Sequence, residues 1–210
     1  GGTDEVDLLP PLQPGKLICL AGNYAEHLEE GGTQRAPEKE TTNPWLFSKP
    51  VTTGLIGPED TVILPHITDS IDWEVELGIV IGKRAKYVSA SEAENYIAGY
   101  TIFNDISARD TQSVEMPGGL GPSKSKDFDT GNIIGPCIVT ADEIDPYDLD
   151  MIVRVNGKER SCGSSSTIHW TFEDLITHIS RSETLHPGEF IASGTVGGGS
   201  GLELQRYLEP

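Results

Sequence analysis

The sequence predicts a β-rich α+β fold, and two features of its 210 residues support this class. Short apolar runs bounded by glycine or proline occur along the whole chain, which is typical of strands. The few stretches with helical periodicity do not alternate regularly with them, as parallel βαβ units would require. No linker or internal repeat divides the chain, so we expect one domain over residues 1–210. Because "RYLEP" ends where a turn would lead into another strand, we also expect further C-terminal sequence.

In the first third of the chain we expect strands at 16–21, 44–50 and 61–65, each a short apolar run next to proline or glycine. The segment 24–32, "YAEHLEEGG", suggests a short polar helix. Residues 28–43 carry Gly31-Gly32, Pro37 and many charges, which indicates a mobile loop. This loop is a candidate lid that orders when substrate excludes water.

Further along, a helix is predicted to begin at Ser89, with Glu92 completing a capping box, and to stop at Gly99. The clearest helix covers 171–182, where apolar residues recur with helical spacing at Phe172, Leu175, Ile176 and Ile179. The remaining expected elements are strands at 71–82, 100–107, 132–140 and 190–196, and a hairpin over 150–165 that turns at Asn156-Gly157.

Composition excludes several classes of function. A net charge of −18 argues against a nucleic-acid backbone or an anionic membrane surface as partner. No apolar run is long enough to span a bilayer. Neither a dinucleotide-binding or phosphate-binding glycine motif nor a serine nucleophile elbow is present. Three scattered cysteines (Cys19, Cys137 and Cys162) favour a reducing environment, which predicts a cytoplasmic location.

Two glutamates interrupt the strand "IDWEVELGIVIG" at 71–82. Side chains alternate between the faces of a strand, so Glu74 and Glu76 project from one side, about 6.5–7 Å apart at the backbone, while the other face is apolar throughout. Two neighbouring anions need either open water or a shared cation. On the glutamate face, Gly78 and Gly82 would leave room above the strand.

Asp105 offers a third carboxylate, in a segment apolar enough to be buried. Carboxylate oxygens without sulfur or a histidine cluster suit Mg²⁺, Mn²⁺ or Ca²⁺ better than zinc. The alternative is that Asp105 caps a turn at the end of its strand.

Three cationic side chains are candidates for the same site. Lys124 and Lys126 would share a face if their segment is extended, and either both are solvated or one stands beside the metal and stabilises an oxyanion. Arg109 could hold a substrate carboxylate, or else form a salt bridge with Asp110 or Glu115.

His27 and Glu30 lie three residues apart on one face of the predicted polar helix. Glutamate in this position can orient an imidazole and favour its charged form. The same spacing is common on ordinary surface helices, so the pair alone does not indicate a site.

These motifs together resemble the fumarylacetoacetate hydrolase family. The segments "GNYAEHLEE", "LFSKP", "WEVELGIVIGKRA", "GYTIFNDISARD", "SKDFDTGNIIGP" and "GEFIASGT" follow the family's order and spacing across residues 16–201. The family includes acylpyruvate hydrolases and 2-hydroxyhepta-2,4-diene-1,7-dioate isomerases. The resemblance implies a mixed β-roll or barrel with a few short helices, usually a homodimer.

The resemblance also implies roles for individual residues. It places Mg²⁺ or Mn²⁺, with Ca²⁺ as a further candidate, on Glu74, Glu76 and Asp105. It makes Lys126 the active-site lysine, and His27 with Glu30 a pair that acts on a water or a substrate proton. Substrate-facing positions correspond to Arg109, Gln112 and Thr195. The chain departs from the family in "SGTVGGGSG", where Val196 replaces the usual proline.

The expected reaction is hydrolysis of a carbon–carbon bond in an acylpyruvate-like 1,3-dicarbonyl 2-oxo acid. In this scheme the metal chelates the substrate, His27 activates water, and the metal and Lys126 stabilise the departing enolate. The same enolate would serve decarboxylation of a 2-oxo dicarboxylate or isomerisation of a 2-hydroxy-diene-dioate, and the sequence leaves these open. A non-catalytic metal-binding scaffold is the remaining alternative.

Overall fold

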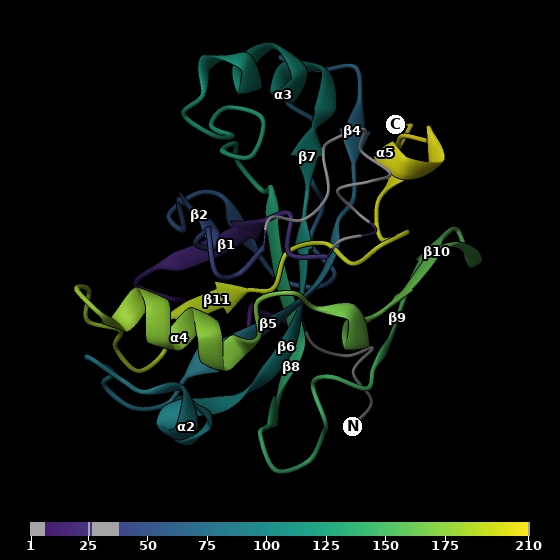
Figure 1. Ribbon diagram of the computed structural model, residues 1–210. Helices are drawn as coiled ribbons and strands as arrows, with labels where there is room; N and C mark the ends of the chain where they lie inside the picture. The colour runs from purple at the N-terminus through teal and green to yellow at the C-terminus, as the bar shows by residue number, and fades with distance from the viewer. Residues whose placement is uncertain (1–6, 25, 27–37, 210) are drawn as a thin grey trace.

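The computed structural model describes residues 7–24, 26 and 38–209 (Figure 1). The strands are β1 Leu17–Ala21, β2 Trp45–Lys49, β3 Leu55–Ile56, β4 Ile71–Asp72, β5 Val75–Ile81, β6 Ile97–Asp105, β7 Ser107–Ala108, β8 Asn132–Thr140, β9 Asp150–Val155, β10 Lys158–Ser164 and β11 Phe190–Ala192. The helices are α2 Ala90–Ala93, α3 Arg109–Glu115, α4 Phe172–Ser180 and α5 Gly201–Leu204, with 3₁₀ turns at Glu94–Tyr96, Met116–Gly118 and Ser165–Thr167.

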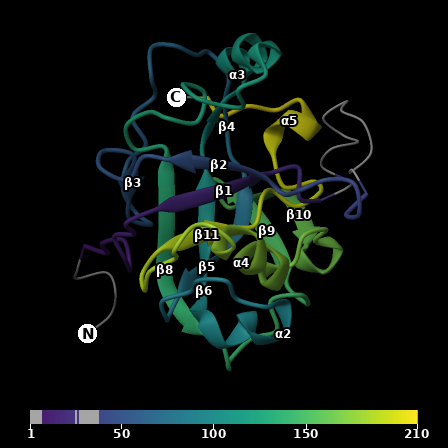
Figure 2. The ribbon, with the colours of Figure 1, turned by 60° about the vertical axis from the view of Figure 1, so that its left-hand side comes forward.

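A curled, mixed sheet of seven strands forms the centre of the described structure, in the order β2-β1-β11-β5-β6-β8-β3 (Figure 2). The pairs β1–β11 and β3–β8 are parallel, and the other neighbours are antiparallel. Two smaller pairs, β9–β10 and β4–β7, lie outside this sheet. The prediction of a β-rich fold with a mixed sheet and a few short helices is therefore confirmed.

Helix α4 covers one face of the sheet. Its capping box joins Thr171 and Asp174, and its apolar stripe is buried, as the periodicity predicts. The stripe packs with the odd-numbered side chains of β5 in the largest core cluster, whose other members include Leu20 and Ile191. A second cluster around Phe103 and Phe190 fills the opposite face. Strand β5 is thus buried on both sides.

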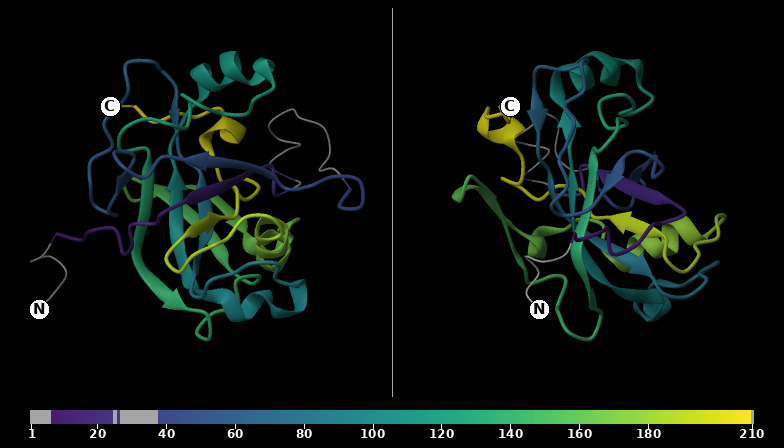
Figure 3. Two further views of the ribbon diagram at one scale, coloured as in Figure 1. Left: turned by 90° about the vertical axis from the view of Figure 1, so that its left-hand side faces the viewer. Right: turned by 180° about the vertical axis from the view of Figure 1, so that it is seen from behind.

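Short helices and the β4–β7 pair lie at the two ends of the sheet. Helix α2 lies at one end, and α3, α5 and the β4–β7 pair lie at the other (Figure 3). No helix in the described part of the chain is long and apolar enough to cross a membrane.

Several predicted elements match the structure closely. The strand prediction at 132–140 coincides with β8, and the 150–165 hairpin turns at Asn156 and Gly157, both with positive φ (52° and 73°). This left-handed pair is typical of a tight type I′ turn. The predicted polar helix at 24–32 lies mostly outside the described residues, as do residues 28–37 of the predicted loop.

Two predictions of secondary structure are wrong. Residues 61–65 are not a strand, and the Ile63 N–H donates to the Thr130 hydroxyl instead of to a strand neighbour. The helix that begins after Ser89 ends at Ala93, and β6 already runs through Gly99. A Cβ at Gly99 would overlap the Val139 carbonyl oxygen, so this glycine serves a close backbone approach within the sheet and does not stop a helix.

The strand predicted at 71–82 is divided. Residues 71–72 pair with β7, and the chain joins the main sheet only from Val75. The space above Gly78 is also filled, because a Cβ there would overlap the Phe190 ring. The expected room above the glutamate face is therefore occupied by core packing.

This packing makes Gly78 sensitive to a single added methyl group. We expect Gly78→Ala to lower the free energy of unfolding by about 1–3 kcal/mol, the usual range for overpacking a filled core. Gly118→Ala is the control, because Gly118 is exposed and a Cβ there would meet nothing within 4 Å. Urea unfolding of both variants measures the difference. Equal stability of the two would contradict the packing described here.

Candidate functional site

Three carboxylates converge where β5 and β6 pair. Val75 lies opposite Asn104, and the Asp105 N–H donates to the Glu74 carbonyl at 3.1 Å. One carboxylate oxygen from each of Glu74, Glu76 and Asp105 lies within 4.8 Å of the others. Glu74 and Glu76 are only 5% and 1% exposed, so the alternative of a solvated glutamate face is wrong.

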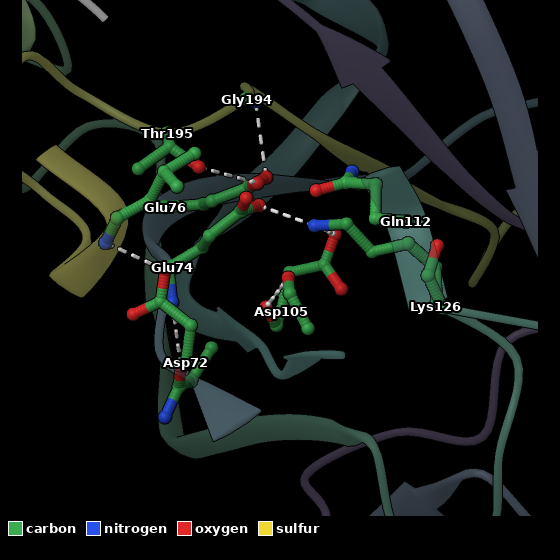
Figure 4. A network of polar contacts seen from close by, with 12 residues as sticks. Asp72, Glu74, Glu76, Asp105, Gln112, Lys126, Gly194 and Thr195 are labelled. Carbon is green, nitrogen blue, oxygen red and sulfur yellow. Dashed lines mark hydrogen bonds and ion pairs between the residues drawn. The ribbon is translucent and has the colours of Figure 1, made fainter. Parts of the chain in front are cut away.

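Lys126 and Lys49 neutralise part of this charge. The Lys126 ammonium lies 2.6 Å from Glu74 Oε2 and 2.9 Å from Asp105 Oδ2 (Figure 4). Lys49, at the buried end of β2, contacts the other oxygen of Asp105. Asp105 is thus held between two ammonium groups, and the alternative of a turn-capping aspartate is wrong.

Arg109, the first residue of α3, contacts Asp72, Glu74 and Gln112. Its Nε lies 2.7 Å from Asp72 Oδ2, its Nη2 lies 2.7 Å from Glu74 Oε1, and its Nη1 donates to Gln112 Oε1 at 2.9 Å. Asp72 also accepts the backbone N–H groups of Gly201 and Leu202 from α5. The alternative of a salt bridge from Arg109 to Asp110 or Glu115 is therefore wrong.

Glu76 is the more deeply buried of the two glutamates, and its carboxylate accepts hydrogen bonds from uncharged groups. It accepts the Gly194 N–H at 3.0 Å and the Thr195 hydroxyl at 3.4 Å. Burial, with the nearby charges of Asp105 and Glu74, raises the pKa of Glu76 well above its usual value. An added cation would offset both effects by favouring the ionised form.

Lys126 keeps its charge in this setting. Burial alone would lower its pKa, but the charges of Asp105 and Glu74 outweigh that effect and raise the pKa above its ordinary value. An ammonium has three N–H donors, and the two carboxylates account for two of them.

The donor set fits a divalent metal ion. Four buried carboxyl groups outnumber three buried cations among the residues just named, so the cluster has an excess of negative charge when Glu76 is ionised, the form that a bound cation favours. Each carboxylate oxygen can accept more than one partner, so the lysine contacts leave ligand capacity. Buried oxygen ligands suit Mg²⁺ and Mn²⁺. Glu74, Glu76 and Asp105 could therefore hold such an ion.

A cavity of about 440 Å³ opens beside the carboxylates. It brings together Glu74, Lys126, Arg109, Gln112 and Thr195, five of the predicted site residues. The described residues that line it are Leu20, Ala21, Gly22, Trp45, Phe47, Glu74, Arg109, Gln112, Ser113, Met116, Pro122, Lys126, Thr195 and Leu202.

The remaining predicted site residues fall into two groups. His27 and Glu30 lie outside the described residues, so their roles stay predictions. Lys124 is exposed, and the segment around it forms turns instead of an extended chain. The prediction that Lys124 and Lys126 share one face is therefore wrong, and Lys126 alone reaches the carboxylates.

Sequence reasoning missed Lys49 and Asp72. A signal for each exists: Lys49 closes an apolar strand in "LFSKP", and Asp72 precedes Glu74 by two residues. A charge in such a strand needs a buried partner, because an uncompensated one is costly. The sequence does not say which partner it is, since Lys49 and Asp105 are 56 residues apart.

Metal binding can be measured directly. Calorimetric titration with Mg²⁺ or Mn²⁺ should show binding by the wild-type protein and by Glu143→Ala, which removes an exposed carboxylate, but not by Glu76→Ala. A hundredfold excess of metal over its dissociation constant should raise the free energy of unfolding by about 2.7 kcal/mol. Undiminished binding by Glu76→Ala would contradict the assignment of these ligands.

Lys49 should contribute more to the stability of the metal-free protein than to that of the metal-loaded protein. Removing one partner of a buried ion pair typically costs about 3–5 kcal/mol, so we expect Lys49→Met to destabilise metal-free protein by that amount. Saturating Mg²⁺ should reduce the loss, because the ion supplies positive charge beside Asp105. Urea unfolding with and without Mg²⁺ tests this, with the exposed Lys158→Met as control. An equal loss in both conditions would contradict a shared charge-balancing role.

Comparisons with known proteins agree with this geometry. The family model for the fumarylacetoacetate (FAA) hydrolase C-terminal region matches residues 16–210. An uncharacterised protein of Pyrococcus abyssi is 46% identical over 88% of this chain and 79% of its own length. A mitochondrial oxaloacetate tautomerase of Rattus norvegicus is 40% identical over 90% of this chain, which spans 58% of that protein.

Solved structures show the same fold. The 5-carboxymethyl-2-hydroxymuconate delta-isomerase of Mycobacterium smegmatis superimposes with a TM-score of 0.77 at 39% identity, over 91% of this chain and 71% of that one. The tautomerase and the isomerase named here are both enzymes. The chain therefore belongs to the fumarylacetoacetate hydrolase family of enzymes.

Proposed function

We propose that the protein is a metal-dependent hydrolase of carbon–carbon bonds in acylpyruvate-like 2-oxo acids. The observation that carries this proposal is a buried Glu74–Glu76–Asp105 cluster with the Lys126 ammonium beside it, at the wall of a substrate-sized cavity. Mg²⁺ or Mn²⁺ held by these carboxylates would supply a Lewis acid and a template for the 2-oxo acid.

Lys126 has the position and charge to stabilise a developing enolate. Cleavage between the two carbonyl groups of a 1,3-dicarbonyl leaves negative charge on the pyruvate side. The ammonium lines the cavity and is fixed by Glu74 and Asp105, so little reorganisation is needed when the charge forms. Gln112 also lines the cavity and is held by Arg109, which suits a role in orienting the substrate.

Hydrolysis also requires an activated water. The family resemblance assigns this role to His27, polarised by Glu30, and we retain that assignment as part of the proposal. A positioned general base typically contributes about 10²–10⁴-fold to the rate.

Isomerase or tautomerase chemistry is the second candidate. It needs the same stabilised enolate but no attacking water, and two of the similar proteins are named as a tautomerase and an isomerase. Decarboxylation of a 2-oxo dicarboxylate would use the same electron sink. A 2-oxo acid, or its 2-hydroxy enol form, is the substrate in all three reactions. Homodimer formation and a cytoplasmic location stay predictions.

The candidates differ in their need for His27. We expect His27→Ala to lower acylpyruvate hydrolysis by about 10²–10⁴-fold and to affect oxaloacetate decarboxylation much less, since only hydrolysis needs a base for water. Lys126→Ala should abolish both activities. Steady-state turnover at saturating Mg²⁺ measures these effects, with His66→Ala, at an exposed histidine, as control.

Two results would change the proposal. Equal losses on both substrates in His27→Ala would mean that His27 positions the substrate and does not activate water. Turnover of neither substrate by the wild-type protein would favour isomerase chemistry or a non-catalytic metal-binding scaffold.

A further inference from the structure

We propose that the site selects 2-oxo acids whose tail, beyond the reacting dicarbonyl, is apolar and uncharged, and that it discriminates against tails with a second carboxylate. This inference rests on the proposed function, because it takes the 2-oxo acid head to lie at Glu74, Glu76 and Asp105. It concerns the remainder of the 440 Å³ cavity.

The positive charges at the cavity are already committed to protein carboxylates. Of the described residues that line it, two are cationic, Arg109 and Lys126. Arg109 holds Asp72 and Glu74, and Lys126 holds Glu74 and Asp105. A tail carboxylate would have to compete for one of these buried pairs or enter the cavity without a partner. Both are unfavourable.

One wall of the cavity becomes less polar with distance from the carboxylates. Residues 45, 47 and 49 share a face of β2, because side chains alternate along a strand. Lys49 contacts Asp105 at the buried end, while Phe47 and Trp45 line the cavity beyond it. The wall from Lys49 to Trp45 is about 13 Å long at the usual strand rise.

Other segments add apolar residues to the cavity lining. Met116 and Pro122 follow α3, and Leu202 lies in α5. Beyond Arg109 and Lys126, the described lining contains no further cation, and its uncharged polar side chains are those of Gln112, Ser113 and Thr195. The described lining therefore fits a hydrocarbon tail and offers a charged tail end no cation that is not already paired with a protein carboxylate.

Two large apolar residues at the cavity are strongly exposed. Trp45 is 50% exposed and Met116 is 45% exposed. An apolar tail lying between them would remove this surface from water as well as its own, which is the condition for hydrophobic binding. Each buried methylene should then improve affinity about three- to fourfold.

The selectivity would differ from what two relatives' names suggest. One relative is named for oxaloacetate and another for 5-carboxymethyl-2-hydroxymuconate. Both of these compounds carry more than one carboxylate. In this chain the lining around Trp45 and Met116 is apolar. We therefore expect its substrate to have an uncharged tail, unlike those two compounds.

Binding of substrate-like inhibitors tests the inference without turnover. Oxamate mimics the 2-oxo acid head, N-butyloxamate adds an apolar tail, and N-(3-carboxypropyl)oxamate adds a charged tail of similar reach. Titration calorimetry on Mg²⁺-loaded protein should show N-butyloxamate binding about tenfold or more tighter than oxamate. The carboxypropyl compound should bind no tighter than oxamate.

Adjacent residues of β2 provide the variant and its control. Trp45→Ala should remove most of the advantage of N-butyloxamate, whereas Leu46→Ala should retain it, because Leu46 points to the other face of the strand and does not line the cavity. Trp45→Lys should reverse the preference by giving the charged tail a partner.

The outcomes separate the two proposals. If the carboxypropyl compound binds more tightly than N-butyloxamate, or if Trp45→Ala keeps the butyl advantage, the tail inference is overturned and the proposed function stands. If oxamate itself fails to bind the metal-loaded protein, the 2-oxo acid head is wrongly placed and both are overturned.

Discussion

The burial of carboxylates inside the sheet is the constraint on which the structure depends. Glu74, Glu76 and Asp105 lie in or next to β5 and β6, where water is excluded, and an isolated buried carboxylate is costly. Lys49, Arg109 and Lys126 offset part of that cost from three separate segments. The cluster therefore ties β2, the start of α3 and the turn around Lys126 to the centre of the sheet.

The same constraint shapes the chemistry available at the cavity. Because the cations are paired with carboxylates, the site could hold a metal ion beside one ammonium at its base, and the described residues of the cavity wall add no unpaired cation. Lys126 belongs to both systems: it balances Glu74 and Asp105, and it faces the cavity. A site of this kind suits a substrate that brings its negative charge to the base and leaves its tail uncharged.

Local sequence rules predicted what depends on local geometry. Strand alternation places Glu74 and Glu76 together, the Asn156-Gly157 turn follows from positive φ at both residues, and the stripe of α4 follows from helical periodicity. What failed depends on distant contacts. Residues 61–65 have strand-like composition but no strand partner. Gly99 is required by the close approach of the Val139 backbone. Nothing in the local sequence identifies Asp105 as the partner of Lys49.

The claim that these carboxylates form a metal site is tested most directly by crystallography of the full chain grown with Mn²⁺. Anomalous diffraction should show one strong peak within coordination distance of Glu74, Glu76 and Asp105, with Lys126 beside it. A map without a peak at this position, in which the Lys126 ammonium alone bridges Glu74 and Asp105 at saturating Mn²⁺, would contradict the account.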